Sequence, residues 1–402
     1  MINVGIIGAG ASGLAAACVL AAGAEDVCVT LIEKKEQAGK KLLLTGNGRC
    51  NYSHTVISPE DYHASDPAFI SRFLERFSPE DARSFFLSLG MLSAERNGGL
   101  YPASFQASSV LNVLLDALKQ KEVPILCNSA VSDIKPDDLG FLVKTEEGKT
   151  YRFTHLILAC GSASGTKDRR PFNAYSLLEA LGHTVAKPLP SLVKLNGAEG
   201  FEKAWSGVRV RARVSLDEDS DTGEVQLTDQ GISGIPVFQL SHRAVRELED
   251  HSSVSVELDF LPEYSAEVLT KLLSATDKNR AVLSVLRGWL PRKLAEVILK
   301  KKHIYPETKA GELTEQVKRD LVGFIKRFPY RVTGHGSFAE SQVTSGGVLL
   351  NEITDDFGSR LCPGLYITGE LLDADGKCGG YNLHFAWGSG KLAAEAILRG
   401  KG

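Results

Sequence analysis

The chain opens with two short apolar runs separated by a stretch rich in alanine and leucine. Residues 2–7 and 27–32 are long enough for buried parallel strands, and residues 14–22 predict the helix between them. A strand, a helix and a strand in this order form the unit from which doubly wound parallel sheets are built. The pattern therefore predicts an α/β protein.

Similar patterns return later in the chain. Asp66-Pro67 and Ser78-Pro79 each place a capping side chain before a proline, which is typical of a helix start. Three strands joined by short turns precede an apolar run that ends in glycine, as expected for an excursion that returns to the parallel sheet. The later predicted elements are a helix at 108–121, strands at 125–134, 141–145, 151–153, 156–161 and 365–370, and a helix at 383–398.

The composition changes near residues 187–190, where two prolines interrupt the chain. After this point residues 208–214 alternate between apolar and charged side chains, which predicts a half-exposed strand. The segment up to residue 261 therefore predicts a small β-rich module, and the segment after it is helical. The predicted elements are strands at 208–214, 224–228 and 254–260 and helices at 237–249, 266–274, 281–290, 291–302 and 313–326.

A glycine-rich loop joins the first strand to the first helix. It reads Gly8-Ala9-Gly10-Ala11-Ser12-Gly13, which is the G-x-G-x-x-G pattern. Gly8 allows the tight turn, Gly10 lets the backbone approach a diphosphate, and Gly13 lets the helix pack on the strand. Glu33 follows the second strand, where a carboxylate accepts hydrogen bonds from both ribose hydroxyls. Together these features predict a dinucleotide site.

A second loop follows soon after Glu33 and is dense in glycine and cationic donors. It contains Lys34, Lys40, Lys41 and the tetrapeptide Gly48-Arg49-Cys50-Asn51. Such a loop could wrap the diphosphate and the ribityl chain of a flavin. The alternative is an exposed turn with solvated lysines.

Segments at later strand ends extend the candidate site. The last predicted helix is opened by Gly379-Gly380-Tyr381-Asn382, and its positive end can face the flavin N1 and C2 carbonyl, where negative charge develops on reduction. The further candidate contacts are Val131, Ala159, Cys160, Gly161, Gly369, Glu370, Asp373, Gly380, Tyr381 and Asn382.

Charge and cysteine content exclude several classes of protein. The 402 residues carry 46 basic and 49 acidic side chains, a net charge of −3, so no global positive field attracts nucleic acid or anionic lipid. The seven cysteines form no C-x-x-C pair, which disfavours a disulfide framework and a zinc site, and no metal is predicted. The longest apolar stretch, residues 13–24, is too short to span a bilayer, so we expect a cytoplasmic protein.

These motifs together resemble the glutathione-reductase-like class of FAD proteins. More narrowly, the chain resembles the bacterial NAD(P)/FAD-dependent oxidoreductases, or aminoacetone-oxidase-like flavoproteins. The resemblance implies a discontinuous Rossmann-like FAD-binding domain at 1–190 and 331–402, a β-barrel-like insert at 191–261, and a helical insert at 262–330 that forms a lid over the flavin. Cys160 departs from the wider class, which usually has threonine there. The motifs most specific to the family are Gly48-Arg49-Cys50-Asn51 and Gly379-Gly380-Tyr381-Asn382.

The predicted activity is that of an FAD-dependent oxidoreductase. No second G-x-G-x-x-G follows the first, so NADH or NADPH would dock only transiently as the electron donor. The leading hypothesis is hydride transfer from flavin N5 to an activated C=C bond of a small molecule. The resemblance leaves two other reactions open, an amine oxidase acting on aminoacetone-like substrates and a uracil reductase (dihydrouridine synthase) acting on ribosomal RNA. A non-catalytic flavin-binding sensor or scaffold is a further alternative.

Two groups of side chains bear on these alternatives. Tyr381, Cys378, His384 and His335 are weak candidates for a proton donor, and no catalytic residue is assigned. A basic stretch could meet RNA phosphates, but a solvated helix face is the favoured interpretation, because a spacing of 3.6 residues does not align all of its members. Its members are Arg287, Arg292, Lys293, Lys300, Lys301, Lys302, Lys326 and Arg327.

Overall fold

The computed structural model describes residues 2–23, 26–165 and 173–400. The chain divides into two compact units. One unit comprises Met1–Leu189 and Val343–Gly402, and the other comprises Pro190–Gln342. The first unit is therefore discontinuous in sequence, with the second inserted into it.

The first unit is built on a five-stranded parallel sheet in the order β20-β11-β1-β2-β7. The central strands β1 and β2 coincide with the two predicted apolar runs and are mostly buried, as expected for strands covered on both faces. The strands are β1 (Ile2–Ile7), β2 (Val27–Ile32), β7 (Ile125–Leu126), β11 (His155–Leu158) and β20 (Leu365–Ile367).

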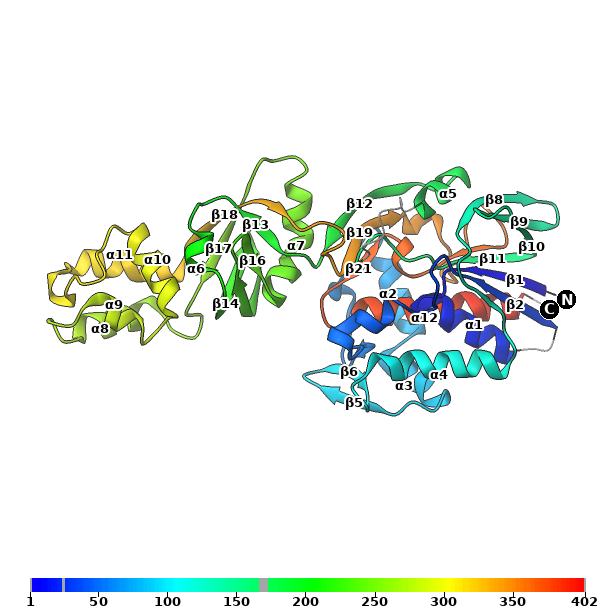
Figure 1. Cartoon of the computed structure of the whole chain (residues 1–402), viewed down its shortest axis with the longest axis horizontal. Coiled ribbons are helices and arrows are strands. Elements are labelled where there is room, and N and C mark those ends of the chain that lie inside the picture. The colour runs from blue at the N-terminus through cyan, green and yellow to red at the C-terminus, as the bar shows by residue number, and fades with distance from the viewer. Residues whose placement is uncertain (1, 24–25, 166–172, 401–402) are drawn as a thin grey trace. The chain divides into compact units, whose positions relative to one another are not determined.

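Helices α1 (Ala11–Gly23), α4 (Ala107–Gln120) and α12 (Tyr381–Arg399) lie together beneath β1 and β2 in Figure 1. Small residues allow α1 and α12 to approach closely. A Cβ at Gly390 would lie 2.2 Å from the Ser12 carbonyl oxygen, and a Cβ at Gly23 would lie 2.3 Å from the Leu398 side chain. The C-terminal helix thus becomes part of the packing around the first one.

An antiparallel layer covers the other side of the sheet. It consists of β8 (Val131–Asp137), β9 (Gly140–Thr145) and β10 (Thr150–Phe153), in the order β10-β9-β8. The prediction of one strand at 125–134 is wrong, because the chain leaves the parallel sheet after β7 and starts a new strand at Val131. This break lets β7 extend the parallel sheet while β8 joins the layer above it.

The remaining elements of the first unit surround the carboxyl edge of the sheet. They are η1 (Leu42–Gly48), β3 (Ser53–His54), η2 (Pro59–Asp61), β4 (Tyr62–Ala64), α2 (Pro67–Arg76), α3 (Pro79–Ser88), β5 (Ser93–Arg96), β6 (Gly99–Pro102), α5 (Ala174–Ala180), β12 (Val185–Ser191), β19 (Val343–Val348), η4 (Leu350–Glu352), η5 (Gly369–Leu371) and β21 (Ala374–Gly376).

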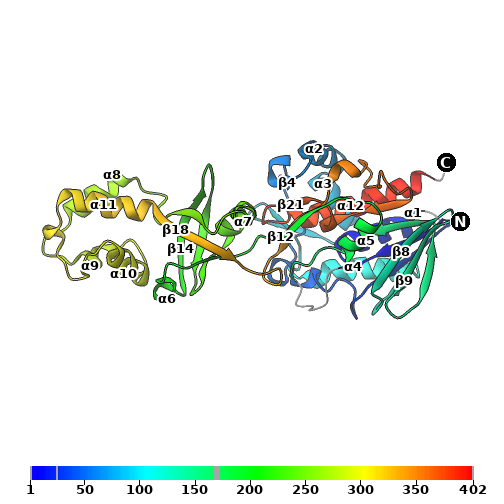
Figure 2. The same ribbon diagram turned by 90° about the horizontal axis from the view of Figure 1, so that it is seen from above.

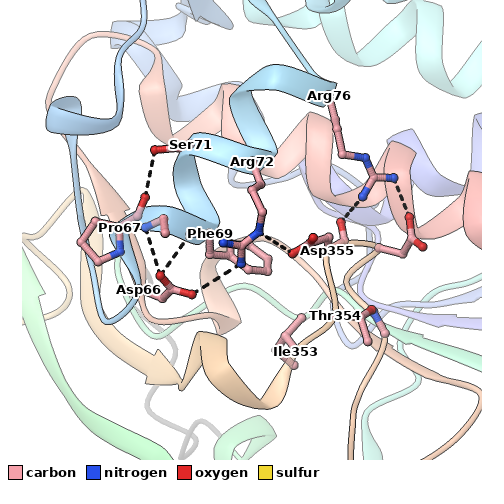
Figure 3. Close-up of polar contacts among 12 residues, drawn as sticks. Asp66, Pro67, Phe69, Ser71, Arg72, Arg76, Ile353, Thr354 and Asp355 are labelled. Atoms are coloured by element: carbon pink, nitrogen blue, oxygen red, sulfur yellow. Dashed lines mark hydrogen bonds and ion pairs between the residues drawn. The ribbon is translucent and has the colours of Figure 1, made fainter.

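The start of α2 is fixed by its capping residue and by ion pairs (Figure 3). Asp66 accepts hydrogen bonds from the N–H groups of Ala68 and Phe69, at 3.0 and 3.1 Å. Arg72 donates to Asp355 at 2.9 Å and lies 3.6 Å from Asp66, so one guanidinium joins the capping residue to the loop after η4. The predicted capping role of Asp66 is confirmed.

The second unit contains a closed six-stranded barrel in the cyclic order β13-β16-β15-β14-β17-β18. Its strands alternate between buried and exposed side chains, which is the pattern of a barrel with a packed interior. Two helices accompany the barrel strands. The elements are β13 (Leu195–Gly197), α6 (Glu202–Trp205), β14 (Val208–Leu216), β15 (Asp219–Leu227), β16 (Gly231–Ser233), α7 (Ile235–Glu247), β17 (Val254–Asp259) and β18 (Phe328–His335).

Between β17 and β18 the chain forms a helical group, in which α8 packs on α11 and α9 on α10 (Figure 2). These helices are α8 (Ala266–Ala275), α9 (Val282–Leu286), α10 (Arg292–Lys301) and α11 (Glu315–Lys326), with η3 (Ala310–Glu312) before the last. The chain does not return to the first unit at residue 331, because β18 pairs with β13 and β17 and closes the barrel. The second unit extends to Gln342.

Among the described residues, no helix is both long enough and apolar enough to cross a membrane. The longest helix of the first unit, α12, carries charged residues such as Lys391 and Glu395 along its length.

Candidate functional site

Four parallel strands end in one row at the same edge of the sheet. Ile7 pairs with Ile32 and with Leu158, and Leu158 pairs with Ile367. In open parallel sheets, ligands bind outside this carboxyl edge. The predicted segments that directly follow the four strand ends are 8–13, Glu33, 159–161 and 369–373.

The glycine loop has the shape that a diphosphate requires. Gly8 has φ +104°, and a Cβ there would lie 2.4 Å from the Ala159 carbonyl oxygen, so only glycine fits. A Cβ at Gly13 would lie 2.0 Å from the Gly8 carbonyl oxygen. Around Gly10, by contrast, no described atom beyond its neighbours lies within 4 Å of the Cβ position. Helix α1 begins at Ala11, so its unpaired N–H groups start at this open point.

Glu33 is held against the glycine loop. Its carboxylate accepts hydrogen bonds from the N–H groups of Ala9 and Lys35, both at 2.9 Å, and the residue is only 9% exposed. The structure thus fixes the carboxylate beside the loop and leaves further lone pairs for ligand hydroxyls. Lys34 is half-buried next to it.

The structure separates two of the three predicted lysines, Lys40 and Lys41. Lys40 pairs with Glu36 at 2.5 Å on the exposed surface, one turn away in sequence. Lys41 instead pairs with Glu370 at 2.8 Å and thereby connects the second loop to the end of β20. Of these two lysines, Lys41 is therefore the one that the structure brings together with another predicted site residue.

The loop before Asn51 has an unusual backbone. Gly46, Asn47, Gly48 and Cys50 all have positive φ, and such conformations are enriched at ligand-binding segments. Arg49 is exposed, whereas Cys50 is fully buried. Burial raises the pKa of the Cys50 thiol to about 12, which makes a thiolate nucleophile unfavourable at neutral pH.

Asn51 lies between two glycines. A Cβ at Gly99 would lie 2.7 Å from its Nδ2, and a Cβ at Gly380 would lie 2.8 Å from its Oδ1. Oδ1 is buried and accepts no hydrogen bond from the described residues. Because an unsatisfied buried acceptor is costly, this atom is suited to a ligand donor.

The residues that follow β11 contact the end of β1. Cys160 donates a weak hydrogen bond from Sγ to the Ile7 carbonyl oxygen at 3.4 Å, and Gly161 has φ +66°. Burial raises the pKa of the Cys160 thiol to about 12, so it acts as a neutral packing group in place of the usual threonine. The carbonyl oxygen of Val131 accepts a hydrogen bond from Asn173 at 2.9 Å.

The turn after β20 is fixed from three sides. The N–H of Gly369 donates to Ser389 Oγ at 2.9 Å, and Glu370 Oε1 accepts from the N–H of Thr344 at 3.0 Å. The N–H of Asp373 donates to the Val348 carbonyl oxygen at 2.9 Å, and Asp373 is 9% exposed.

The start of α12 depends on close backbone approach. Gly380 has φ +102°, and a Cβ there would lie 2.5 Å from the Ser53 carbonyl oxygen. The Tyr381 ring stacks on His54 with centroids 5.2 Å apart, and burial raises the pKa of its hydroxyl.

Asn382 has a structural role that its sequence position does not reveal. Its side chain accepts from the N–H of Gly376 at 2.8 Å and donates to the carbonyl oxygens of Gly376 and Lys377, at 2.7 and 3.3 Å. Asn382 therefore closes the turn before α12 and so positions the two glycines there.

These features fit FAD. The space at Gly10 suits a diphosphate, the Glu33 carboxylate suits a ribose, and the buried Asn51 oxygen suits a ring donor. The helix start at Gly380 offers N–H groups to developing negative charge.

Comparison with known proteins identifies the family. Residues 2–396 match the family described as HI0933-like protein Rossmann domain. This chain belongs to the HI0933-like family. It is 38% identical to a 3-dehydro-bile acid delta(4,6)-reductase from Clostridium scindens, over 98% of this chain and 99% of that protein. It is 29% identical to a ribosomal RNA dihydrouridine synthase from Haemophilus influenzae, over 98% of each chain.

A solved structure shares the fold at low identity. The 3-ketosteroid delta1-dehydrogenase from Sterolibacterium denitrificans has a TM-score of 0.52 and 14% identity, and all of each chain is covered. The predicted Rossmann-like α/β fold with an inserted barrel is confirmed, and so is the class of FAD-dependent oxidoreductase.

The candidate proton donors of this HI0933-like chain differ in their surroundings. His384 is fully buried, with Nδ1 2.9 Å from Ser53 Oγ and Nε2 3.0 Å from the Phe77 carbonyl oxygen. Burial lowers the pKa of His384 to about 4, so the ring is neutral and holds the first turn of α12 in place. His335 lies in the barrel and contacts the Gly336 carbonyl oxygen, and Cys378 is half-buried.

A second polar cluster lies before β12. His183 contacts Glu352 at 3.0 Å and Ser359 Oγ at 2.9 Å, which resembles the order of a serine, histidine and acid triad. However, Ser359 Oγ also accepts from the N–H groups of Leu361 and Cys362, at 3.1 and 2.9 Å. Because these bonds occupy the lone pairs that a nucleophile needs, the cluster is a structural brace.

Most side chains of the predicted basic stretch have bonding partners within the second unit. Five of its eight members have partners there, which leaves Arg287, Lys300 and Arg327 without a described partner. The engaged groups are Arg292 with Glu296 (2.7 Å), Lys293 with the Ser206 carbonyl oxygen (2.8 Å), Lys301 with Glu199 (2.9 Å), Lys326 with Asp259 (2.6 Å), and Lys302 over the Phe324 ring (5.4 Å).

Sequence reasoning missed residues that act through contacts between distant segments. Ser53 contacts His384, and Ser389 receives the N–H of Gly369. For Ser389 a signal was present, because Gly388-Ser389-Gly390 interrupts a long helix with small residues that permit close approach.

Proposed function

We propose that this chain is an FAD-dependent reductase of a carbon–carbon double bond conjugated to a carbonyl group, on a steroid-like small molecule. The observation that carries this proposal is the 38% identity, over nearly the whole length, to a protein named for the reduction of the delta(4,6) bonds of a 3-dehydro bile acid. The bonds reduced there are activated by the 3-keto group, which matches the predicted substrate chemistry.

The residues of the chain would have the following roles in binding the cofactor. The N–H groups at Gly10 to Gly13 hold the diphosphate, Glu33 accepts from the ribose, and Lys41 with Glu370 holds the second loop against β20. The N–H groups at the start of α12 stabilise negative charge that develops on the ring system. When bound, the flavin supplies the hydride that adds to one carbon of the double bond.

NADH or NADPH is proposed as the electron donor. The only G-x-G-x-x-G of the chain is already assigned to FAD, so the nicotinamide would bind transiently and leave before the substrate enters. Cytoplasmic localisation and the role of the helical insert as a lid stay predictions.

Anaerobic half-reactions test the proposed function. The purified protein is mixed with NADH or NADPH while flavin absorbance is followed, and a 3-keto-4,6-diene bile acid is then added. We expect bleaching by one donor and reoxidation by the dienone, with product mass increased by pairs of hydrogens. Reoxidation only by oxygen after bleaching with aminoacetone would favour the oxidase alternative. If the dienone reoxidises neither the flavin reduced by NADH or NADPH nor the flavin reduced by dithionite, the proposal is wrong.

Reduction of uracil in ribosomal RNA is the second candidate. Two ribosomal RNA dihydrouridine synthases match 98% of this chain, at 29% and 27% identity, and the uracil double bond is likewise conjugated to a carbonyl. Lys300→Glu removes one of the basic groups that have no described partner, so RNA binding should weaken. The slope of the logarithm of the binding constant against the logarithm of salt concentration should fall in magnitude by about one. Lys301→Gln, at a lysine already paired with Glu199, is the control.

A further inference from the structure

Two phenylalanines among the described residues have backbones in the strained left-handed region, and packing explains only one of them. Phe357 has φ +62° and is fully buried, with ring contacts to Phe69 and Phe73, so core packing offsets its strain. Phe105 has φ +53° but is only half-buried and lies outside the core. Because this region is unfavourable for a bulky side chain, the strain at Phe105 needs another explanation.

The strained residue closes a turn that brings its ring back against Tyr101. The N–H of Phe105 donates to the Pro102 carbonyl oxygen at 2.8 Å. The ring centroids of Tyr101 and Phe105 lie 5.4 Å apart, with 34° between the ring planes. Tyr101 is likewise half-buried. The strained backbone at Phe105 therefore fixes the position of the Tyr101 ring.

Gly99 lets the hydroxyl end of Tyr101 lie beside the Asn51 amide. Gly99 and Tyr101 are two positions apart on β6 and so share one face of the strand. A Cβ at Gly99 would lie 3.0 Å from Tyr101 Cε2, the ring carbon next to the one that bears the hydroxyl, and 2.7 Å from Asn51 Nδ2. Among residues 2–23, 26–165 and 173–400, no group accepts a hydrogen bond from the Tyr101 hydroxyl.

The same amide connects Tyr101 to the start of α12. A Cβ at Gly380 would lie 2.8 Å from Asn51 Oδ1 and 2.5 Å from the Ser53 carbonyl oxygen. Strand β3 pairs with β6, with Ser53 opposite Leu100. Tyr101 therefore lies next to the segment that is proposed to face the flavin ring.

We propose that the Tyr101 hydroxyl donates a hydrogen bond to the carbonyl oxygen of the substrate. This inference rests on the proposed function, in which that carbonyl is conjugated to the double bond. When hydride adds to the carbon of the double bond remote from the carbonyl, the π electrons move onto the carbonyl oxygen, and a donor there stabilises the charge. Those electrons then bind a proton from water at the neighbouring carbon, so one π bond is lost and two C–H bonds form. Tyr101 keeps its own proton, and the proposed nicotinamide donor supplies the two electrons.

The other tyrosines near the start of α12 have positions that internal contacts explain. The Tyr52 hydroxyl shares a hydrogen bond with a serine hydroxyl at 2.5 Å. The Tyr62 hydroxyl donates to the Tyr381 carbonyl oxygen at 2.9 Å. The Tyr381 ring stacks on His54, with centroids 5.2 Å apart. Tyr101 differs from these three because a strained residue outside the core holds it.

The first test compares two ligands that cannot oxidise flavin, a saturated 3-keto bile acid and its 3-deoxy analogue. Their binding to the FAD-loaded, dithionite-reduced protein is measured by anaerobic equilibrium dialysis. The wild type should bind the keto ligand about 10-fold more tightly. Tyr101→Phe removes only the hydroxyl and should lower this ratio towards one, with no decrease in the midpoint of thermal unfolding. Tyr305→Phe, at a tyrosine of the second unit that is 80% exposed, is the control.

Reoxidation of the reduced flavin gives a second readout. In Tyr101→Phe, reoxidation by the 3-keto-4,6-diene bile acid should slow by about 100-fold. Reoxidation by ferricyanide, which has no carbonyl group, should stay at the wild-type rate. Phe105→Leu keeps an apolar side chain but loses the ring, so it should slow the dienone reaction less. The double variant should be no slower than Tyr101→Phe, because Phe105 acts through the Tyr101 hydroxyl.

The inference is wrong if Tyr101→Phe keeps either the wild-type affinity ratio or the wild-type rate with the dienone. It is also wrong if both oxidants slow equally, because the hydroxyl would then act on the flavin or on the fold. Additive effects of the two substitutions would contradict the positioning role of Phe105. If the wild-type reduced flavin does not react with the dienone at all, the proposed function fails and this inference fails with it.

Discussion

The glycine loop and the start of α12 both present helix N–H groups to a ligand, but the chain builds them differently. The loop and its carboxylate lie within residues 8–33, and the Ala9 N–H to Glu33 bond is satisfied inside this segment. The start of α12 depends on contacts with Ser53, Asn51 and Tyr62 from more than 300 residues earlier. The first region is local in sequence, whereas the second is assembled by tertiary packing and retains a buried acceptor on Asn51. This difference suits the glycine loop to holding a cofactor and the start of α12 to taking part in the reaction.

Gly13→Val should have the largest effect on the local region. A Cβ at Gly13 would lie 2.0 Å from the Gly8 carbonyl oxygen, so the loop must shift and the protein should lose about 3 kcal/mol of stability and its flavin. Gly10→Ala is the matched control, because its Cβ meets no described atom within 4 Å. It should keep the thermal stability and lose only flavin affinity. Flavin content and the midpoint of thermal unfolding distinguish the two variants, and equal stability of both would contradict the account.

The buried His384 should make the assembled region sensitive to acid. Its folded pKa of about 4 lies below the ordinary value of 6.5, so the unfolded chain binds more protons between these values. The stability from the neutral ring is complete above about pH 6.5 and is lost as the pH falls towards 4. We expect the free energy of unfolding to fall by about 2 kcal/mol from this group between pH 7 and pH 5. In His384→Asn the free energy of unfolding should decrease less between pH 7 and pH 5. In His251→Asn the decrease should be the same as in the wild type.

Glu33→Gln tests the contribution of the carboxylate to FAD affinity and to the stability of the loop. The amide oxygen can accept from the Ala9 N–H or from the Lys35 N–H but not from both, so the free energy of unfolding should fall by about 1 kcal/mol, whereas affinity for FAD should fall about 10-fold. Titration of apoprotein with FAD, followed by fluorescence quenching, gives the dissociation constant. Glu36→Gln removes an exposed carboxylate that pairs with Lys40, and it should bind FAD as the wild type does.

Asp66→Ala should have the smallest effect. The capping carboxylate accepts two N–H groups of α2, and its loss should cost about 1 kcal/mol. The helix supports α12 through Phe73, whose ring lies 5.0 Å from that of Phe385 (centroid to centroid). Chemical denaturation measures the loss. Asp355→Asn weakens only the exposed ion pair with Arg72 and should lower the free energy of unfolding by less than Asp66→Ala does. A larger loss in Asp355→Asn would show that the capping bonds of Asp66 do not stabilise the helix.

The sequence could predict elements whose signal is local. The strands β1 and β2 match their apolar runs residue for residue, and Asp66 caps its helix as expected. The glycine loop was equally visible, because its pattern needs only neighbouring residues. The strand β18 was missed although Phe328, Tyr330 and Val332 alternate with exposed residues, since a helical stretch precedes it directly. The single strand predicted at 125–134 is divided between two sheets at a point that the polar residues Asn128 and Ser129 mark in the sequence.

Side-chain roles in the assembled region were beyond sequence reasoning. Asn382 was predicted to contact the cofactor, but it bonds to its own turn, and Lys40 pairs with Glu36 on the surface. Neither outcome follows from residue type or spacing. Tyr62 reaches the Tyr381 carbonyl oxygen because β4 and β21 pair across more than 300 residues.

The most direct test of the account is the flavin content of the purified protein. The carboxyl edge of the sheet, with Gly10, Glu33 and Asn51, predicts about one FAD per chain, released intact on heating and restored when FAD is added back to apoprotein. Protein that stays colourless after incubation with FAD would contradict the account at its base.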